Sequence, residues 1–405
     1  MGEISDATIR GRAALVGIGQ TEFGKRLPRT AWDLALEAVL AALDDAGIEP
    51  AEVDGLCRYV SPFETVSAPM LVRGLGLREL RFFAESPLGG EALGAVMSHA
   101  ACAIATGQAR TVVVYRALSQ STGGRFGRAD QGPGGGAVAP DPDADIVVPE
   151  VENRSFAWPY GMMSPGHLFA MWVTRYMHVY DVPEDKMTEA LGAVALQQRR
   201  YANANPGAMM RDRPLDWPTY LEGRMISWPL RLFDLCLEND GACAVVLTDA
   251  ERAVRLRQPA IHLLAATQSL APYHEPMGLY VDDLLEFSPP AAQERLFAGA
   301  GVRPDRLSVA ELYDATSFMT VKGLESYGVA ATGWGWAHAA EQGIGLDSPL
   351  PVNTHGGHLS EGYIHGMNGV TEAVRQLRGT AANQVPGADV ALVGAPSGSA
   401  MILAS

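Results

Sequence analysis

Cysteine is scarce in this sequence. The 405 residues contain four cysteines and no CxxC pair, at Cys57, Cys102, Cys236 and Cys243. A small secreted domain held together by disulfides needs a denser set, and a zinc site built on thiolates needs closely spaced pairs. Both classes are excluded, and we expect a reduced protein in the cytoplasm.

Positive charge and long apolar runs are lacking as well. Lysine and arginine number 31 against 46 aspartate and glutamate residues, and the net charge of −15 offers no electrostatic footprint for a nucleic acid. The N-terminal stretch MGEISDATIRGRAALVGIG contains no apolar run of the length that a signal peptide or a membrane span requires. A few local arginines are still enough to bind an anionic ligand such as a coenzyme A thioester.

Two nucleotide-binding motifs are incomplete in the segment GIGQTEFGKR. Glu22 stands where the third glycine of GxGxxG belongs, and Arg26 stands where a phosphate loop carries Ser or Thr. No GxSxG occurs anywhere, so the nucleophile of an α/β-hydrolase is absent too. We therefore expect this segment to be a plain strand followed by a turn.

The chain contains the same series of elements twice. Short β-branched runs bounded by turn residues are typical of interior parallel strands. The repeated elements are first strands at 12–21 and 259–268, helices led by Gly89-Gly90 and by Gly356-Gly357, and apolar strands at 109–118 and 387–396. This order indicates an internal duplication of an α/β unit.

Residues 119–231, between the copies, differ in composition. The first part, STGGRFGRADQGPGGGAVAPDPDAD, predicts an irregular surface loop, and the second has apolar residues at helical spacing. We expect an N-terminal half over 1–255 that carries this helical insertion, and a C-terminal half over 256–405. A long insertion on such a scaffold commonly covers a substrate site.

The segment NTHGGHLSEGYIHG, residues 353–366, contains three histidines and four glycines. Zinc needs three or four ligands that converge at about 2 Å. His355, His358 and His365 are spaced for this only if the chain between them folds back, and a diglycine helix start spreads neighbouring side chains apart. We expect polar histidines that line a cleft, and no metal.

Each diglycine has two possible uses. A helix N-terminus presents free N–H groups and the positive end of its dipole, and the missing side chains allow a ligand to approach. Two such N-termini that meet across a duplicated sheet would suit a thioester oxygen that gains negative charge. The alternative is close packing of a helix on a strand, and both interpretations stay open.

The chain as a whole resembles the thiolase superfamily, in the branch of sterol carrier protein X thiolases and bacterial lipid-transfer proteins. The resemblance is carried in order by VGIGQTEFGK, the insertion from SPGHLFAMWVTRYMHVYDVPEDK onward, LFDLCLENDGACAVVLTD, ELYDATSF and NTHGGHLSEGYIHG. It implies duplicated βαβαβαββ halves in an α/β/α/β/α protomer with a helical loop-domain insertion. It also implies a homodimer formed through a sheet edge.

Several positions depart from the thiolase pattern. The segment Glu85–Val96, where thiolases carry their nucleophile, contains no cysteine, and none follows Cys243, where the second thiolase cysteine would stand. Cys102 lies further along the helix and is interpreted as a packed core residue. Tyr313 and Tyr363 replace the histidines of the thiolase HDCF and GHP segments. Two tyrosines for two histidines is the pattern of the lipid-transfer-protein steroid side-chain aldolases.

The resemblance to these aldolases implies retro-aldol cleavage of a β-hydroxyacyl-CoA derived from a steroid side chain. The products would be a 17-keto steroid and a short acyl-CoA such as propionyl-CoA. The reaction requires a group that takes the hydroxyl proton, a site for the enolate oxygen and a proton source for the enolate carbon. It needs no cofactor besides the coenzyme A of the substrate.

We assign proton transfer to Tyr313 and Tyr363, with Tyr363 at the substrate hydroxyl. The predicted substrate and oxyanion set is Asn353, His355, Gly356, Gly357, His358, His365, Gly89 and Gly90. Candidates for binding the coenzyme A phosphates are Arg125, Arg128, Arg211, Arg213 and Arg231.

Two other functions remain open. A catalytically silent thiolase-like subunit that carries lipid, or scaffolds an acyl-CoA-processing complex, would also lack the cysteine. A residual acyltransferase would use Cys102. Members of this branch work with a small OB-fold protein that often carries a zinc ribbon, so the resemblance also implies a heterotetramer of two copies of each chain.

Overall fold

The structure is a computed structural model of the 405-residue chain. It describes residues 9–60, 66–86, 89–122, 158–162, 164–269, 284–286, 288 and 290–405. Arg125, Arg128 and most of the expected surface loop lie outside the described residues. Within these ranges, no helix combines the length and the hydrophobicity needed to cross a membrane.

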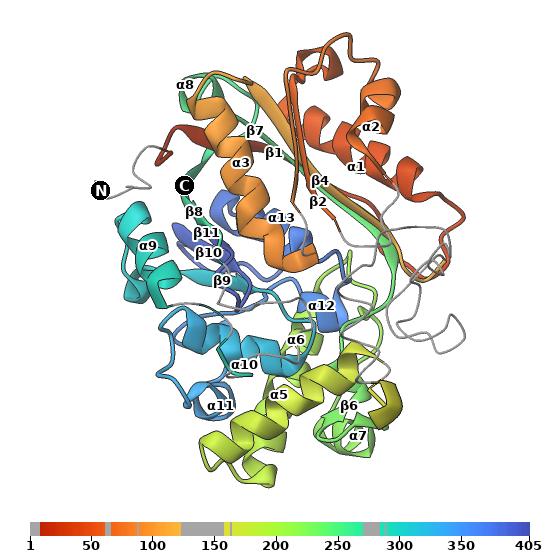
Figure 1. The fold of residues 1–405 in the computed structure, drawn as a ribbon, viewed down its shortest axis with the longest axis vertical. Coiled ribbons are helices and arrows are strands. Elements are labelled where there is room, and N and C mark those ends of the chain that lie inside the picture. The colour runs from red at the N-terminus through yellow and green to blue at the C-terminus, as the bar shows by residue number, and fades with distance from the viewer. Residues whose placement is uncertain are drawn as a thin grey trace.

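One sheet of nine strands runs through the molecule, in the order β3-β2-β4-β7-β1-β8-β11-β10-β9 (Figure 1). The strands are β1 Ala13–Gln20, β2 Gly55–Tyr59, β3 Phe82–Ser86, β4 Thr111–Ser119, β7 Asp240–Asp249, β8 Ile261–Thr267, β9 Val309–Leu312, β10 Val390–Gly394 and β11 Ala400–Ala404. The two halves of the sheet meet at β1 and β8, which share only the pairs Ala14–His262 and Leu15–Ile261.

The two halves have the same topology. The order β2-β4-β7-β1 corresponds to β9-β10-β11-β8, and in each series the first pair is parallel and the next two are antiparallel. The strands expected at 109–118 and 387–396 are interior, as predicted. The expected parallel pairing is found on one side of each strand, because β4 and β10 each have one parallel and one antiparallel neighbour.

The longer helices are α1 Ala31–Ala46, α2 Ala68–Leu75, α3 Leu93–Ala105, α5 Pro165–Val179, α6 Glu184–Ala204, α9 Pro290–Ala300, α10 Ser317–Ser326 and α13 Met367–Arg378. Shorter ones are α7 Trp217–Glu222, α8 Ala250–Ala253, α11 Gly335–Ala337 and α12 Gly357–Ser360. A capping box between Thr30 and Asp33 begins α1, and Gly47 in the left-handed conformation ends it.

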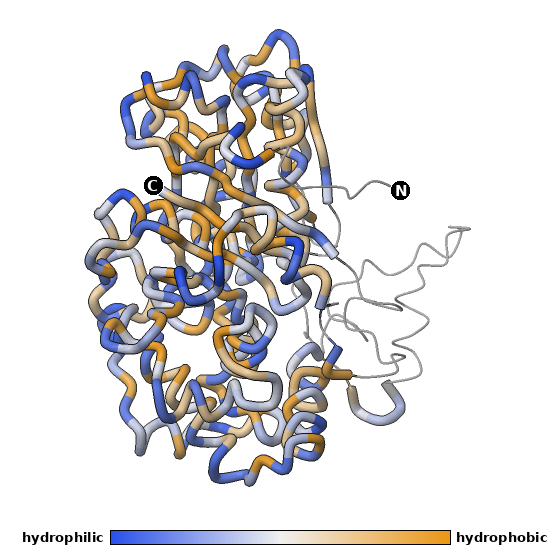
Figure 2. The backbone as a smooth tube through the Cα atoms, turned by 90° about the vertical axis from the view of Figure 1, so that its left-hand side faces the viewer, coloured by the Kyte–Doolittle hydropathy of each residue, from blue (hydrophilic) through white to orange (hydrophobic). Residues whose placement is uncertain are grey.

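Three hydrophobic cores join five layers of helices and half-sheets. One joins α1 and α2 to the outer face of the first half-sheet, and a second surrounds α3 and α13 between the half-sheets. The third joins α5, α6, α9 and α10 to the outer face of the second half-sheet. The arrangement is therefore the α/β/α/β/α architecture of the prediction, with hydrophilic residues at the outer turns (Figure 2).

The GxG of the first strand serves packing. A Cβ atom at Gly17 would lie 2.1 Å from the carbonyl oxygen of Ala42, and one at Gly19 would lie 2.0 Å from that of Ala38. Both glycines therefore allow α1 to lie directly on β1. The expected strand is confirmed, and its glycines face a helix backbone.

The insertion between β4 and β7 contains α5, α6, α7 and a two-stranded ribbon, β5 Met225–Ser227 and β6 Leu230–Arg231. In Figure 1 it lies at the lower end of the molecule, beside α10 and α12. Helix α6 contacts both of these helices. The insertion thus supports the second half of the fold from the side where Gly356 and Gly357 lie.

The two diglycines begin helices that differ from the prediction. Gly89 and Gly90 form a 3-10 turn before α3. The expectation of one long helix from Gly356 is wrong, because α12 ends after four residues and α13 starts only at Met367. The positive φ angles of His365 (51°) and Gly366 (90°) interrupt the helical conformation between them.

Candidate active site

Two tyrosine hydroxyls meet at the end of the second half-sheet. Tyr313 directly follows β9, and its backbone N–H donates to the carbonyl of Gly394 at the end of β10. Tyr363 lies between α12 and α13, and its backbone N–H donates to Asn239 Oδ1 at 2.6 Å. The two hydroxyl oxygens are 2.6 Å apart, although 50 residues separate them in the sequence. The structure therefore brings together the two residues assigned to proton transfer.

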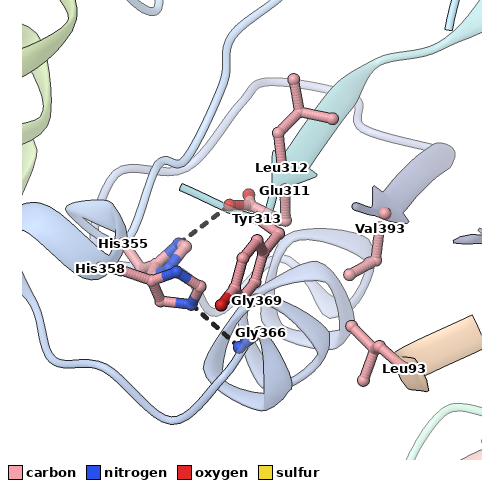
Figure 3. Close-up of a pocket in the computed structure, with 10 residues that line it drawn as sticks. Leu93, Glu311, Leu312, Tyr313, His355, His358, Gly366, Gly369 and Val393 are labelled. Carbon is pink, nitrogen blue, oxygen red and sulfur yellow. Dashed lines mark hydrogen bonds and ion pairs between the residues drawn. The ribbon is translucent and has the colours of Figure 1, made fainter. Parts of the chain in front are cut away.

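His358 holds this pair from one side. Its ring makes edge-on contacts with Tyr313 (centroids 5.1 Å apart) and Tyr363 (5.0 Å). Its Nε2 accepts a hydrogen bond from the backbone N–H of Gly366 (Figure 3). Its Nδ1 lies 3.0 Å from Asp314 Oδ1 and 3.3 Å from the backbone nitrogen of Asp314. His358 thus uses both nitrogens within the protein and orients the two rings.

His365 contacts the pair from another side. Its ring centroid lies 4.5 Å from that of Tyr363. Its Nδ1 accepts from the guanidinium of Arg116, and its Nε2 lies 3.3 Å from the side-chain amide of Gln120. Burial, the charge of Arg116 and His358 hold the pKa of His365 well below its usual value, so the ring is neutral.

His355 lies in a buried acidic cluster. Its Nδ1 lies 2.9 Å from Glu311 Oε2 and its Nε2 3.8 Å from Glu361 Oε2. Burial acts to lower the pKa of His355, but Glu361, Glu311 and Glu372 outweigh it and raise the pKa to about 10. Burial raises the pKa of Glu311 to about 7. The three histidines therefore differ in role: His358 and His365 contact the tyrosine rings, and His355 forms an ion pair with glutamates.

The other predicted binding residues are close to the pair but packed. Asn353 is fully buried, and its Oδ1 accepts from the backbone N–H of Leu312 at 2.7 Å. The N–H of Gly356 donates to the carbonyl of Asn353, and a Cβ atom at Gly357 would lie 2.4 Å from Asp314 Oδ2. These contacts favour the packing interpretation for the second diglycine.

The first diglycine borders the site directly. A Cβ atom at Gly90 would lie 2.3 Å from the ring of Tyr313, so the missing side chain makes room for this tyrosine. A small cavity of ≈ 10 Å³ lies beside the same ring, bordered by Leu93, Glu311 and Val393 among others (Figure 3). This volume is at the lower limit for one water molecule.

The cysteines take no nucleophilic position here. The interpretation of Cys102 as a packed core residue is wrong, because its side chain is exposed on α3. Cys236 lies close enough to Tyr363 to affect its ionisation, and burial and Asp314 raise the pKa of the Cys236 thiol to about 12. Cys236 is therefore a neutral thiol beside the site. Within the described ranges, no group of three or more His, Cys, Asp or Glu residues is arranged to hold a metal ion.

The remaining candidate arginines lie in the insertion. Arg211 and Arg213 are exposed, in a turn whose neighbours Met209 and Met210 donate backbone hydrogen bonds to the carbonyls of Glu361 and Ser360. Their position beside α12 keeps both as candidates. Arg231 is half-buried, and its guanidinium carbon lies 5.6 Å from the ring centroid of Tyr220.

Sequence reasoning missed four residues that shape the site: Arg116, Asn239, Asp314 and Gln120. Arg116 gave a visible signal, since it is the only charged residue in the apolar run TVVVYRALS. The others stand in loops without periodicity, where no local pattern distinguishes a buried polar side chain from an exposed one.

Comparison of the sequence with known proteins identifies its relatives. Residues 278–404 match the family described as Thiolase C-terminal domain-like. The chain is 39% identical to the 17-hydroxy-3-oxo-4-pregnene-20-carboxyl-CoA lyase of Mycobacterium tuberculosis, over 96% of this chain and 97% of that protein. It is 37% identical to the steroid side-chain-cleaving aldolase of Thermomonospora curvata, over 93% of each.

Solved structures agree. The structure of the Ltp2-ChsH2(DUF35) aldolase superposes with a TM-score of 0.85 and 35% identity, over 98% of this chain and 99% of that one. Human mitochondrial 3-ketoacyl-CoA thiolase shares the fold, with a TM-score of 0.65 and 16% identity over 98% and 99% of the two chains.

Proposed function

The chain belongs to the thiolase superfamily, in the branch of the steroid side-chain-cleaving aldolases, and from this membership we propose its reaction and mechanism. It is a carbon–carbon lyase that cleaves a β-hydroxyacyl-CoA derived from a steroid side chain. The products are a 17-keto steroid and a short acyl-CoA such as propionyl-CoA. The observation that carries the mechanism is the contact between the hydroxyls of Tyr313 and Tyr363, at 2.6 Å.

The tyrosine pair suits a relay of protons. Burial and, to a smaller extent, the neighbouring Tyr313 raise the pKa of Tyr363 well above its usual value of about 10. Tyr363 therefore enters the reaction as a phenol. A phenol accepts a proton only if it gives one away. Tyr363 meets this condition because its neighbour Tyr313 lies within a short hydrogen bond.

The proposed steps neither take up nor release a proton overall. The substrate hydroxyl gives its proton to Tyr363, the proton of Tyr363 moves to Tyr313, and Tyr313 delivers its own proton to the α-carbon. Meanwhile the bond between the α- and β-carbons breaks, its electron pair passes to the α-carbon and thioester, and the β-carbon becomes the ketone carbon. The segment Glu85–Val96 contains no cysteine, and this scheme forms no acyl-enzyme.

We assign Asn353 to the thioester oxygen. Its Nδ2 is buried and has no hydrogen-bond partner among the described residues, so it has a donor to offer. A donor that meets an enolate oxygen stabilises the charge that develops there. The coenzyme A of the substrate is the only cofactor that the scheme uses.

We also propose a partner and a location. The name of the similar Ltp2-ChsH2(DUF35) aldolase joins two proteins, and this supports a complex here as well. We expect a small OB-fold protein with a zinc ribbon and a heterotetramer of two copies of each chain. The scarcity of cysteine favours a reducing compartment, the cytoplasm.

The test is direct turnover. The protein, co-expressed with its partner, is incubated with a 17-hydroxy steroid acyl-CoA, and mass spectrometry follows the 17-ketone and the acyl-CoA. Stoichiometric appearance of both products is expected. Absence of both, with binding of the acyl-CoA retained, would favour a silent lipid-carrying subunit instead. Equal activity with and without the partner would count against the heterotetramer.

A further inference from the structure

Arg116 is unusual for its place in the fold. It lies in the middle of β4, whose side chains are otherwise apolar or small, and it is 1% exposed. Removing a guanidinium from water is unfavourable unless hydrogen bonds and nearby groups offset the loss of hydration. A neutral side chain of similar volume would fill this position at lower cost, so the retained charge calls for an explanation.

The side chain of Arg116 reaches toward the tyrosine pair. One of its nitrogens donates to the carbonyl of Tyr59 at the end of β2, and the other to His365 Nδ1. Its guanidinium carbon lies 4.2 Å from the ring centroid of Tyr59, and the Tyr59 hydroxyl donates to the carbonyl of His365 at 2.9 Å. Arg116 and Tyr59 thus hold both the ring and the backbone of His365.

The contact with Arg116 fixes the position of the His365 ring. Nδ1 accepts from the guanidinium of Arg116, and Nε2 lies 3.3 Å from the side-chain nitrogen of Gln120. The backbone of His365 has a positive φ of 51°, a conformation that a non-glycine residue keeps only when its surroundings hold it. The ring then lies edge-on to Tyr363, with the centroids 4.5 Å apart.

We propose that Arg116 is a positioning residue for the reaction: it fixes His365 against Tyr363 and keeps a buried positive charge on that side of the tyrosine pair. This inference rests on the proposed function. During the relay, Tyr363 carries partial negative charge whenever its own proton leaves before the substrate proton arrives. The positive charge of Arg116, one side chain away, stabilises this partial negative charge on Tyr363. The stabilisation is large because the site is buried.

Substitutions separate the charge from the hydrogen bond. Arg116→Gln keeps a donor for His365 and removes the charge, whereas Arg116→Lys keeps the charge on a different geometry. We expect Arg116→Gln to lower kcat by about 10²-fold with KM nearly unchanged, as for the loss of one preorganised electrostatic group. Arg116→Lys should recover much of that loss. Equal kcat in both folded variants would overturn the proposal.

The pH profile provides a second readout. The ionisable groups that face His365 are Arg116 from β4, Tyr59 from β2, His358 from α12 and the neighbouring Tyr363. Without Arg116, the pKa of His365 rises, so the ring can take up a proton as the pH falls. The deficit of Arg116→Gln should therefore shrink at acidic pH and stay constant in the double variant with His365→Asn. A deficit independent of pH in the single variant would contradict the role of the charge.

Arg378 provides the matched control. Arg378 lies on α13, and its side chain is 5% exposed. Its guanidinium forms an ion pair with Asp45 at 2.7 Å. Arg378→Gln removes a buried guanidinium as Arg116→Gln does, and should change thermal stability but leave kcat within a few-fold. If Arg116→Gln does not fold, His365→Asn removes the contact between Arg116 and the ring, and a wild-type kcat in that variant would refute the positioning of His365. Turnover by the wild type tests the proposed function. The kcat of each variant relative to the wild type tests the role of Arg116, so either proposal can be refuted without the other.

Discussion

At the scale of single residues, the chemistry depends on two hydroxyl groups. Each phenol at 2.6 Å from the other donates one proton and accepts another, which is what a relay requires. Phenylalanine keeps the ring and its edge-on contacts with His358, and loses only the oxygen. The pair therefore offers a substitution that separates catalysis from packing.

We expect Tyr313→Phe and Tyr363→Phe each to lower kcat by about 10²–10⁴-fold, because general acid–base groups contribute on that scale. Thermal denaturation should show little loss of stability. Tyr201→Phe is the control, since the Tyr201 hydroxyl donates to the carbonyl of Ile344 at 2.9 Å away from the pair. That variant should keep its turnover, and Cys102→Ala should be equally harmless. Near-normal activity in both site variants would end the assignment.

A second residue-scale prediction concerns His355 and pH. Its pKa of about 10 in the folded protein lies above the ordinary value of about 6.5, because Glu361 and Glu311 outweigh the effect of burial. The native state thus holds this proton more tightly than the unfolded chain. The resulting stabilisation is complete below about pH 6.5 and is lost as the pH rises toward 10.

Urea unfolding of the wild type and His355→Gln at several pH values measures this effect. Between about pH 7 and 10, the free energy of unfolding of the wild type should fall relative to the variant, by at most about 1.4 kcal/mol per pH unit. Parallel curves would show that His355 is not held protonated in the folded state.

At the scale of elements, the turn before α3 determines where Tyr313 lies. Gly90 has no positive φ angle, so alanine suits its backbone, but the added Cβ atom would lie 2.3 Å from the Tyr313 ring. We expect Gly90→Ala to displace the ring and lower kcat by at least about 10-fold, since small misplacements of reacting groups are costly.

Gly166→Ala is the matched control for this change. Gly166 lies within α5, and the nearest atom to an added Cβ there is 3.6 Å away. This variant should fold and react as the wild type does. If Gly90→Ala kept full activity, the turn would not position the tyrosine.

At the scale of the whole molecule, the sheet ends in an edge strand. β3 pairs only with β2 among the described residues, and Phe83 on it is 67% exposed. An open edge with an exposed aromatic ring is suited to pairing with another chain. We predict a homodimer that extends the sheet across this edge.

Light scattering at micromolar concentration checks the assembly. The wild type should have twice the 43.1 kDa mass of the chain, and Phe83→Asp should shift the equilibrium toward monomer, because a charge at the edge opposes pairing. Val254→Asp, at a residue that is 72% exposed after α8, is the control for one added negative charge away from this edge. A monomeric wild type would rule out the homodimer.

The sequence by itself determined the layout of the fold. Strands at the start of each half, the apolar runs before the insertion and near the C-terminus, and the duplication were all readable, because burial imposes local periodicity and glycine marks close approach. The exposure of Cys102 could not be predicted from the sequence. Helix α3 has small apolar residues on all sides, so no polar pattern marks its exposed face.

Only the tertiary structure decided how the site is assembled. The sequence proposed three equivalent histidines, and the fold gives His358 and His365 to the tyrosines and His355 to a buried acidic cluster. These roles depend on backbone turns at Asn353 and His365, where φ is 55° and 51°. Such turns, and the meeting of Arg116 with a loop 249 residues away, follow from packing between distant elements, and packing has no period along the chain.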